Sequence, residues 1–336
     1  TPQFDRRRQR QMCIRDRVQV LVFLIAISGA VAAGDSGEAR ELLEKMTTAM
    51  SQMSYQGTFV YVRDDGVETM RITHLTDETG VRERLYSVSG PHREVIRDRK
   101  GVRCVLQDSA SVVEDQVVSN SYFPELPLAI IDGDNSGYKL ETGGEARIAG
   151  HKARRVTISP RDKFRFGYDF WLEEQTGLLL KWVLFDSLHK PLAKLMFTDF
   201  AVGSAIDLAE IESGSRSEDF VEMKTFSLQK TVVTQSSPRW QPAKLPPGFQ
   251  LTSHSHKAET DGVYEHMVYS DGLAAVSVYV EEQGKGMAVK PGGSQLGTNN
   301  AYTHTMGDIQ ITVIGEVPAI TVKSIAKEMA LAVNSN

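Results

Sequence analysis

The sequence predicts an α+β protein built mostly from antiparallel β-strands, with a large N-terminal domain and a smaller C-terminal α+β domain. Short segments that alternate apolar and polar residues run from residue 55 to residue 203 with turn residues between them, as in sheets that curl into a sandwich or a barrel. Helical apolar spacing occurs near both ends of the chain, at 39–53 and 318–333. A polar stretch, 204–223, separates two strand-rich regions.

The first predicted element is an amphipathic helix at residues 39–53. Its apolar residues recur at helical spacing while charged residues occupy the other face, which is typical of a helix that packs on a core. These apolar residues are Leu42, Leu43, Met46, Ala49, Met50 and Met53.

Strands follow the helix. From Tyr55 the apolar residues alternate with a period of two, as in GTFVYVR and ETMRITHL, and turn signals such as Asp64-Asp65-Gly66 separate the segments. Residues 122–131 (YFPELPLAII) interrupt this pattern with two prolines, which predicts a loop or short helices that pack on the sheet. Strands then resume, include a hairpin with a Gln175-Thr176-Gly177 turn, and end near Gly203.

The expected domain boundaries follow from these patterns. We expect a β domain at 34–203, a linker at 204–223 and a C-terminal domain at 224–336. The linker segment is rich in Ser, Glu and Asp and poor in large apolar residues, which is typical of interdomain segments. Within the C-terminal domain we expect strands, a Gly-rich loop at 285–298 (KGMAVKPGGSQLGT) and the helix at 318–333.

The first 33 residues have the order of a secretory signal peptide. Arginines precede an apolar run at Val18–Ile27 that only Gln19 interrupts, and small residues follow as far as Ala33. We expect cleavage after Ala32 or Ala33, with an uncleaved membrane anchor as the alternative. Residues 1–17 do not resemble a natural signal-peptide start, and we expect them to be an upstream artefact.

The charge balance argues against nucleic-acid binding. The chain of 336 residues has 38 Lys and Arg against 43 Asp and Glu, a formal net charge of −5. Residues 1–33 contain six Arg and two Asp, so removing them leaves 32 basic and 41 acidic residues, a net charge of −9. A chain this acidic is a poor candidate for general nucleic-acid binding, because neutralising phosphates calls for a basic face.

No motif in the sequence predicts catalysis, a cofactor or a metal site. His254 and His256 share one face of an expected strand, but no third ligand stands at a suitable spacing. The sequence contains no HExxH motif and no phosphate-binding glycine loop. We therefore expect a protein that is not an enzyme, and a hydrolase is the weakest of the alternatives.

Two features suggest binding. The first is a cluster of seven basic residues within fifteen positions, which could meet phosphates or an acidic partner; a solvated strand and turn is the simpler alternative. Its members are His151, Lys152, Arg154, Arg155, Arg161, Lys163 and Arg165. The second is the apolar excess of the hairpin, where Phe170 and Trp171 lie on opposite strand faces and Trp182 follows. One face can form the core, and the other needs helices or an apolar ligand as cover.

The chain resembles the MucB/RseB family of periplasmic sigma-E regulators. In the N-terminal region the resemblance rests on three motifs: Met53–Tyr61 (MSYQGTFVY), Tyr122–Pro127 (YFPELP) and the hairpin from Gly167–Glu173 (GYDFWLE) to Thr176–Leu179 (TGLL). In the C-terminal region it rests on Trp240–Pro242, Leu245–Phe249, Tyr269–Val278 and Val313–Pro318. Each motif is weak alone, but the ordered set covers nearly all of the chain that follows the expected signal peptide.

The resemblance implies a fold and a role. It implies an N-terminal domain like that of lipoprotein carriers, a half-open β-barrel with helices and an apolar cavity, and a smaller C-terminal domain. It also implies a periplasmic negative regulator of transcription that binds the periplasmic domain of a membrane-bound anti-sigma factor and protects it from proteolysis. Lipopolysaccharide or lipoprotein acyl chains are the implied releasing ligands. The leading alternative is a lipoprotein or lipid carrier with no regulatory role.

These implications select candidate site residues. The lipid-binding candidates combine the basic cluster with the hairpin: Lys152, Arg154, Arg155, Arg161, Lys163, Arg165, Phe170, Trp171 and Trp182. Three aromatic residues of the C-terminal motifs, Trp240, Phe249 and Tyr269, are the candidates for partner contact. The sequence leaves the oligomeric state open, a homo-oligomer included.

Overall fold

The structure is a computed structural model that describes residues 36–64, 66–90, 93–99, 101–106, 111–115, 123, 126, 137–203, 206, 210–211, 237–259, 262–282 and 290–331. The expected signal peptide at 1–33 lies outside these residues, as does most of the expected linker at 204–223. Among the residues that are described, no helix is long and apolar enough to cross a membrane.

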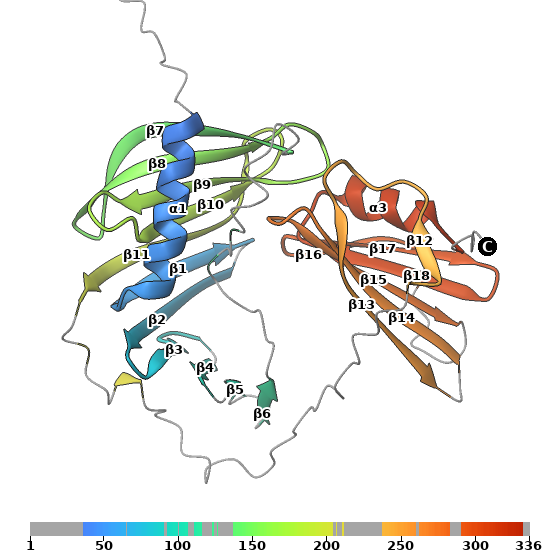
Figure 1. Cartoon of the computed structure of the whole chain (residues 1–336), viewed down its shortest axis with the longest axis horizontal. Helices are drawn as coiled ribbons and strands as arrows, with labels where there is room; N and C mark the ends of the chain where they lie inside the picture. The colour runs from blue at the N-terminus through green and yellow to red at the C-terminus, as the bar shows by residue number, and fades with distance from the viewer. Residues whose placement is uncertain are drawn as a thin grey trace, which may run out of the picture. The chain divides into compact units, whose positions relative to one another are not determined.

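The N-terminal part of the chain forms one eleven-stranded sheet (Figure 1). Its strands are β1 (Tyr55–Arg63), β2 (Gly66–Asp77), β3 (Gly80–Ser87), β4 (Arg93–Asp98), β5 (Gly101–Leu106), β6 (Ser111–Asp115), β7 (Tyr138–Ile148), β8 (His151–Pro160), β9 (Gly167–Glu173), β10 (Leu179–Phe185) and β11 (Pro191–Val202).

The sheet is antiparallel and open. Its strand order is β6-β5-β4-β3-β2-β1-β11-β10-β9-β8-β7, so two meanders are joined where β1 pairs with β11. The strands at the two ends of this order, β6 and β7, are not neighbours. The predicted mostly antiparallel, half-open sheet is therefore confirmed.

Helix α1 (Ser36–Gln52) covers one face of this sheet (Figure 1). Its buried residues are Ala39, Leu43, Met46 and Ala49, which recur every three or four positions, as the sequence predicted for a helix on a core. We call the covered face of the sheet the inner face. The buried positions of β1, among them Tyr55 and Phe59, alternate along the strand and belong to the inner face.

The described residues of the C-terminal part form a smaller six-stranded sheet, a two-stranded sheet and one helix, as predicted for a smaller α+β domain. The six strands are β13 (Gln250–Glu259), β14 (Gly262–Ser270), β15 (Ala275–Glu282), β18 (Ile309–Gly315), β17 (Asn299–Met306) and β16 (Gly292–Leu296), in sheet order. The other elements are β12 (Trp240–Pro242), α3 (Ala319–Glu328) and β19 (Met329–Leu331).

Two elements of the C-terminal part differ from the sequence prediction. Residues 285–298 were expected to be a loop, but Gly292–Leu296 form β16, an edge strand paired with β17. Its side chains are mostly exposed, so main-chain hydrogen bonds hold it without the apolar alternation that marks a buried strand. Helix α3 ends at Glu328 rather than near 333, because Met329 is extended and pairs with Pro242 in the two-stranded sheet.

The lack of a side chain at Gly57 allows β1 and β11 to lie close together. A Cβ atom at this position would lie 2.5 Å from the backbone oxygen of Asp199 and 2.9 Å from a ring carbon of Phe197. We predict that Gly57→Val lowers the free energy of unfolding by about 1–3 kcal/mol, because overpacking moves the strands apart. Urea denaturation measures the change. Gly144→Val is the control, since a Cβ there meets nothing within 4 Å, and equal losses in both variants would contradict the prediction.

Candidate functional site

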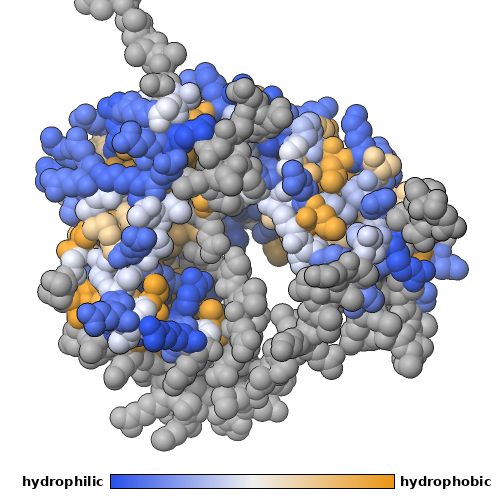
Figure 2. Space-filling model, in the orientation of Figure 1, coloured by the Kyte–Doolittle hydropathy of each residue, from blue (hydrophilic) through white to orange (hydrophobic). Residues whose placement is uncertain are grey.

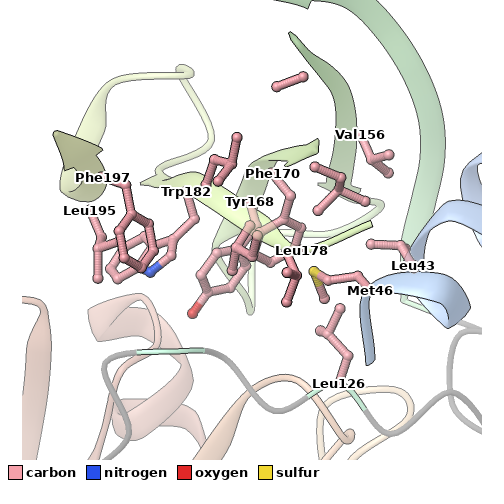
Figure 3. Close-up of a cluster of buried hydrophobic side chains, with 14 of the residues drawn as sticks. Leu43, Met46, Leu126, Val156, Tyr168, Phe170, Leu178, Trp182, Leu195 and Phe197 are labelled. Carbon is pink, nitrogen blue, oxygen red and sulfur yellow. The ribbon is translucent and has the colours of Figure 1, made fainter. Parts of the chain in front are cut away.

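The inner face of the large sheet carries a continuous group of buried apolar side chains. Figure 3 shows these side chains converging from the sheet strands, from α1 and from the segment that contains Leu126. We call this group the inner cluster and define it by Leu43, Met46, Phe59, Phe123, Leu126, Val156, Tyr168, Phe170, Leu178, Trp182, Leu195 and Phe197. All of them are buried except Phe123, which is partly buried against the others.

Aromatic rings dominate one end of the inner cluster. The ring of Phe59 lies 5.6 Å from that of Phe123 and 5.5 Å from that of Phe197, both edge to face. Phe197 also meets Phe200 at 4.8 Å. Such aromatic pairs add roughly 0.5–1.5 kcal/mol each beyond the area that they bury. The cluster is thus a large apolar surface with polarisable ring faces.

Phe123 and Leu126 come from the apolar segment 122–131 that interrupts the strands. They are its two described residues, and both pack on the inner cluster. The prediction that this segment packs on the sheet is confirmed for these two residues. Among the described residues, α1 and these two side chains therefore contribute to the cover of the inner face.

The hairpin divides its aromatic residues between the two faces of the sheet. Phe170 and Trp182 are buried in the inner cluster, as the lipid-binding prediction requires of residues that line an apolar interior. Trp171 points to the opposite face, where it is half-buried and the ammonium of Lys181 lies 4.0 Å from its ring centroid. Cover by a helix thus explains the inner face, while Glu210 covers part of the other face by pairing with Arg71.

The basic cluster of the sequence is dispersed in the structure. Arg154 points to the face of the sheet that helix α1 covers. Its guanidinium pairs there with Glu38 at 3.3 Å and Glu145 at 3.9 Å. Arg155 points to the other side and packs over Gly143. Lys152 is exposed. Hydrophilic residues dominate the visible surface over β7 and β8 (Figure 2).

The remaining three basic candidates lie in the turn after β8. Arg161 donates through Nε to the backbone oxygen of Tyr138 at 2.8 Å. Lys163 is exposed and its ammonium lies 5.7 Å from the Phe164 ring centroid. The structure therefore does not bring these six basic candidates into one anion-binding surface, and a role for any of them in lipid binding stays a prediction.

Arg165 is fully buried. Its Nη1 lies 2.7 Å from Oδ2 of Asp271, and its Nε lies 3.3 Å from a carboxylate oxygen of Asp162. The guanidinium also lies near the rings of Tyr138 and Phe249, at 5.1 and 5.3 Å from their centroids. Buried arginine of this kind holds residues together through paired charge, and it offers no surface to a lipid phosphate.

The three partner-contact candidates of the C-terminal part are core residues. Trp240, Phe249 and Tyr269 are 6%, 4% and 3% exposed and pack with Val278, Val313 and α3 in the second hydrophobic cluster. Their aromatic character therefore reflects packing of the small sheet. In this conformation they present almost no area to a partner, and the contact assigned to them stays a prediction.

A metal ion requires several ligand side chains gathered around one point. The described residues contain no group of three or more His, Cys, Asp or Glu side chains that could hold a metal ion. His254, weighed above as a ligand, lies 4.0 Å from Glu265, and the same carboxylate accepts a hydrogen bond from the backbone of Trp240. The arrangement holds β12 against β14.

Sequence reasoning missed several members of the inner cluster. Phe59 and Phe197 were not among the lipid-binding candidates, although each lies in a segment with period-two alternation, GTFVYVR and PLAKLMFTDF. Alternation identifies a buried face but does not distinguish strands in the middle of a sheet from those at its edge. Their central position follows only from the β1–β11 pairing, which joins residues about 140 positions apart.

Together these features define a class: a two-part, mostly antiparallel β protein in which one face of an open sheet forms an apolar cluster under a helix. The chain belongs to the MucB/RseB family. Residues 38–215 match the MucB/RseB N-terminal domain, and residues 234–330 match the MucB/RseB C-terminal domain.

Relatives support this assignment along nearly the whole chain. The sigma factor AlgU regulatory protein MucB of Pseudomonas aeruginosa is 32% identical over 318 residues, covering 92% of this chain and 96% of that protein. The sigma-E factor regulatory protein RseB of Escherichia coli is 24% identical, covering 86% and 89%. The structure resembles that of MucB in the Pseudomonas aeruginosa MucA/MucB complex, with a TM-score of 0.69 and 29% identity over 88% of this chain and 99% of that one.

Tyr55 provides a pH test of the inner face. It is 2% exposed and stacks on His74 with 4.8 Å between ring centroids. Burial, aided by the nearby Glu83 charge, raises the pKa of its hydroxyl well above the ordinary value. In the unfolded chain the same hydroxyl ionises near pH 10. Ionisation therefore favours the unfolded chain once the pH exceeds about 10, and stability falls as the pH rises further.

We predict that Tyr55→Phe loses less stability than the parent protein between pH 9 and pH 11. Urea midpoints at the two pH values measure the loss, and absorbance at the phenolate band checks that ionisation accompanies unfolding. Other buried tyrosines, such as Tyr168, leave part of the loss in place. Identical losses in the two proteins would show that Tyr55 ionises freely in the folded state.

Proposed function

We propose that this protein is a periplasmic regulator that binds the periplasmic domain of a membrane-bound anti-sigma factor and protects it from regulated proteolysis. In this proposal, lipopolysaccharide or a lipoprotein acyl chain binds the regulator and releases the anti-sigma factor. The protein acts by binding and catalyses no reaction. Export through the signal peptide expected at 1–33 would place it in the periplasm.

One observation carries the proposal of partner binding. The chain resembles, over 88% of its length, a MucB chain whose structure was solved in complex with MucA(peri), with a TM-score of 0.68 and 30% identity. Both the large sheet and the small sheet fall within the two family domains. Likeness in sequence over both domains therefore supports a shared binding role more strongly than likeness in fold alone would.

The inner cluster supports the proposal of lipid binding. Its side chains offer an acyl chain an apolar surface already assembled by the sheet, and each buried methylene contributes about 0.8 kcal/mol. Entry requires that some cover be displaced. Phe123 is a candidate for displacement, since its side chain is only partly buried whereas Leu43 and Met46 of α1 are buried completely or nearly so.

Release of the anti-sigma factor then follows from thermodynamic linkage between its binding and the binding of the acyl chain. If the acyl chain favours a conformation in which the anti-sigma factor binds weakly, each ligand lowers the affinity for the other by the same factor. The alternative, a lipid or lipoprotein carrier without a regulatory role, shares the inner cluster but has no reason to bind an anti-sigma factor.

Binding of the partner is the first test. We expect residues 34–336 to bind the purified periplasmic domain of the anti-sigma factor from the same organism, with affinity measured by calorimetry. Lipopolysaccharide added to the complex should weaken that affinity, while an equal concentration of a neutral detergent serves as control. Absence of partner binding would leave the carrier alternative, and binding that lipopolysaccharide does not change would remove the release mechanism.

Phe123 tests the route of acyl entry. We predict that Phe123→Ala binds a fluorescent sixteen-carbon fatty acid up to about tenfold more tightly, because the chain no longer displaces a ring whose partial burial contributes on the order of 1.4 kcal/mol. Fluorescence titration gives the affinity. Leu188→Ala is the matched control at a side chain that is 85% exposed. An unchanged affinity in Phe123→Ala would show that the fatty acid binds elsewhere.

A further inference from the structure

The face of the large sheet opposite the inner cluster carries a row of four residues in direct register. Trp171 of β9 pairs with Lys181 of β10, Lys181 pairs with Met196 of β11, and Met196 pairs with Val60 of β1. We call these four residues the outer row. Because neighbours across antiparallel strands lie about 5 Å apart, the four side chains form one strip across four strands.

The outer row is more apolar than is usual for the solvent-facing side of a sheet. Met196 is 41% exposed, while Trp171, Lys181 and Val60 are half-buried. Their sequence neighbours on the inner face, among them Trp182 and Leu195, are buried. The solvent-facing side of an antiparallel sheet is ordinarily polar, so an aromatic ring, a thioether and a branched side chain in one partly exposed strip indicate a contact surface.

Positive charge accompanies this strip. The Lys181 ammonium lies 4.0 Å from the Trp171 ring centroid, and Lys194, which pairs with Val183 two residues along β10, is exposed beside it. Burial, and then the charge of Lys194, lowers the pKa of Lys181. The half-buried ammonium of Lys181 is therefore within range of a second positive charge, an arrangement that an anionic partner would relieve.

The other charged groups near Lys181 and Lys194 do not cancel the positive charge of these two lysines. Asp169, which opposes the effect of Lys194 on Lys181, accepts a hydrogen bond from Thr157 at 2.5 Å and lies 3.3 Å from His189. Arg155 pairs with Trp171 across β8 and β9 and extends the strip, and its buried Nε has no hydrogen-bond partner in the described part of the chain.

We infer that the outer row, together with Lys194 and Arg155, is the docking surface for an acidic, partly apolar peptide segment of the anti-sigma factor. Carboxylates of that segment pair with Lys181, Lys194 and Arg155, and an apolar side chain between them packs on Trp171 and Met196. Charge complementarity identifies the occupant: the chain after residue 33 has a net charge of −9 by the count above, so an acidic segment is repelled from most of the surface and attracted here. The inference rests on the proposed function.

Charge reversal tests the surface. The double variant Lys181→Glu/Lys194→Glu should bind the purified anti-sigma periplasmic domain about tenfold more weakly or worse, because two attractions become repulsions. Lys323→Glu/Lys327→Glu is the matched control: both side chains are exposed on α3, and the change in net charge is the same. Calorimetry with residues 34–336 measures each affinity, and circular dichroism checks folding.

Three outcomes overturn the inference. In the first, the parent protein and Lys181→Glu/Lys194→Glu bind the partner equally well. In the second, the control variant loses as much affinity as Lys181→Glu/Lys194→Glu. In the third, Lys181→Glu/Lys194→Glu binds the partner unchanged but no longer sediments with phosphatidylglycerol vesicles. The last outcome would make the strip a lipid-surface contact instead. If the parent protein itself fails to bind the partner, the proposed function fails, and that result is distinguishable from the first three.

A cross-linking experiment keeps the test independent of variant stability. Benzoylphenylalanine at position 196 should cross-link to the anti-sigma domain on illumination, and the same group at position 296, where Leu296 is 84% exposed, should not. Mass spectrometry of the 196 product should locate the link within a segment that contains Asp or Glu. No cross-link at 196 in a complex that forms with full affinity would contradict the inference.

Discussion

The structure depends on one constraint, the need to keep one face of an open eleven-stranded sheet away from water. A closed barrel hides its interior by pairing its first and last strands, but here β6 and β7 stand at opposite ends of the sheet order. Other elements must therefore cover the inner face. Helix α1 contributes Leu43 and Met46 to this cover, and the segment after β6 contributes Phe123 and Leu126.

Because of the same constraint, the side chains of the hydrophobic core are also those of the candidate lipid site. A closed core rarely binds an apolar ligand, since every side chain already has its contacts. If, as proposed, an acyl chain enters by displacing part of the cover, it replaces the contacts that Phe123 loses with Phe59 and Phe197. The net free energy is then small compared with the area involved, which suits a ligand that must bind and release.

The sequence predicted what depends on local pattern. Period-two alternation located the strands of the large sheet, and helical spacing located α1, because both patterns follow from the geometry of a single element. Local pattern also explains the failure at β16: Gly292–Leu296 pairs through its main chain and carries almost no apolar signal. A strand held only by its neighbour is visible only when the neighbour is known.

Features that depend on distant contacts were not predictable. Arg154 pairs with Glu38 of α1, more than a hundred residues earlier in the chain, and the run of basic residues gives no sign of that contact. Arg165 finds its partner Asp271 more than a hundred residues later. The aromatic residues Trp240, Phe249 and Tyr269 were expected to be contact residues, and their place in a second core became apparent only with the small sheet in view.

The two proposed binding surfaces are opposite faces of the same strands, and this arrangement supplies a physical route for coupling between them. Lys181 of the outer row and Trp182 of the inner cluster are consecutive residues of β10, as are Leu195 and Met196 of β11. Consecutive residues in a strand share one peptide plane and point to opposite faces. A shift of β10 against β11 that makes room for an acyl chain beneath Trp182 must therefore also change the spacing between Lys181 and Met196. Such coupling needs no long pathway, since the thickness of a single sheet separates the ligands.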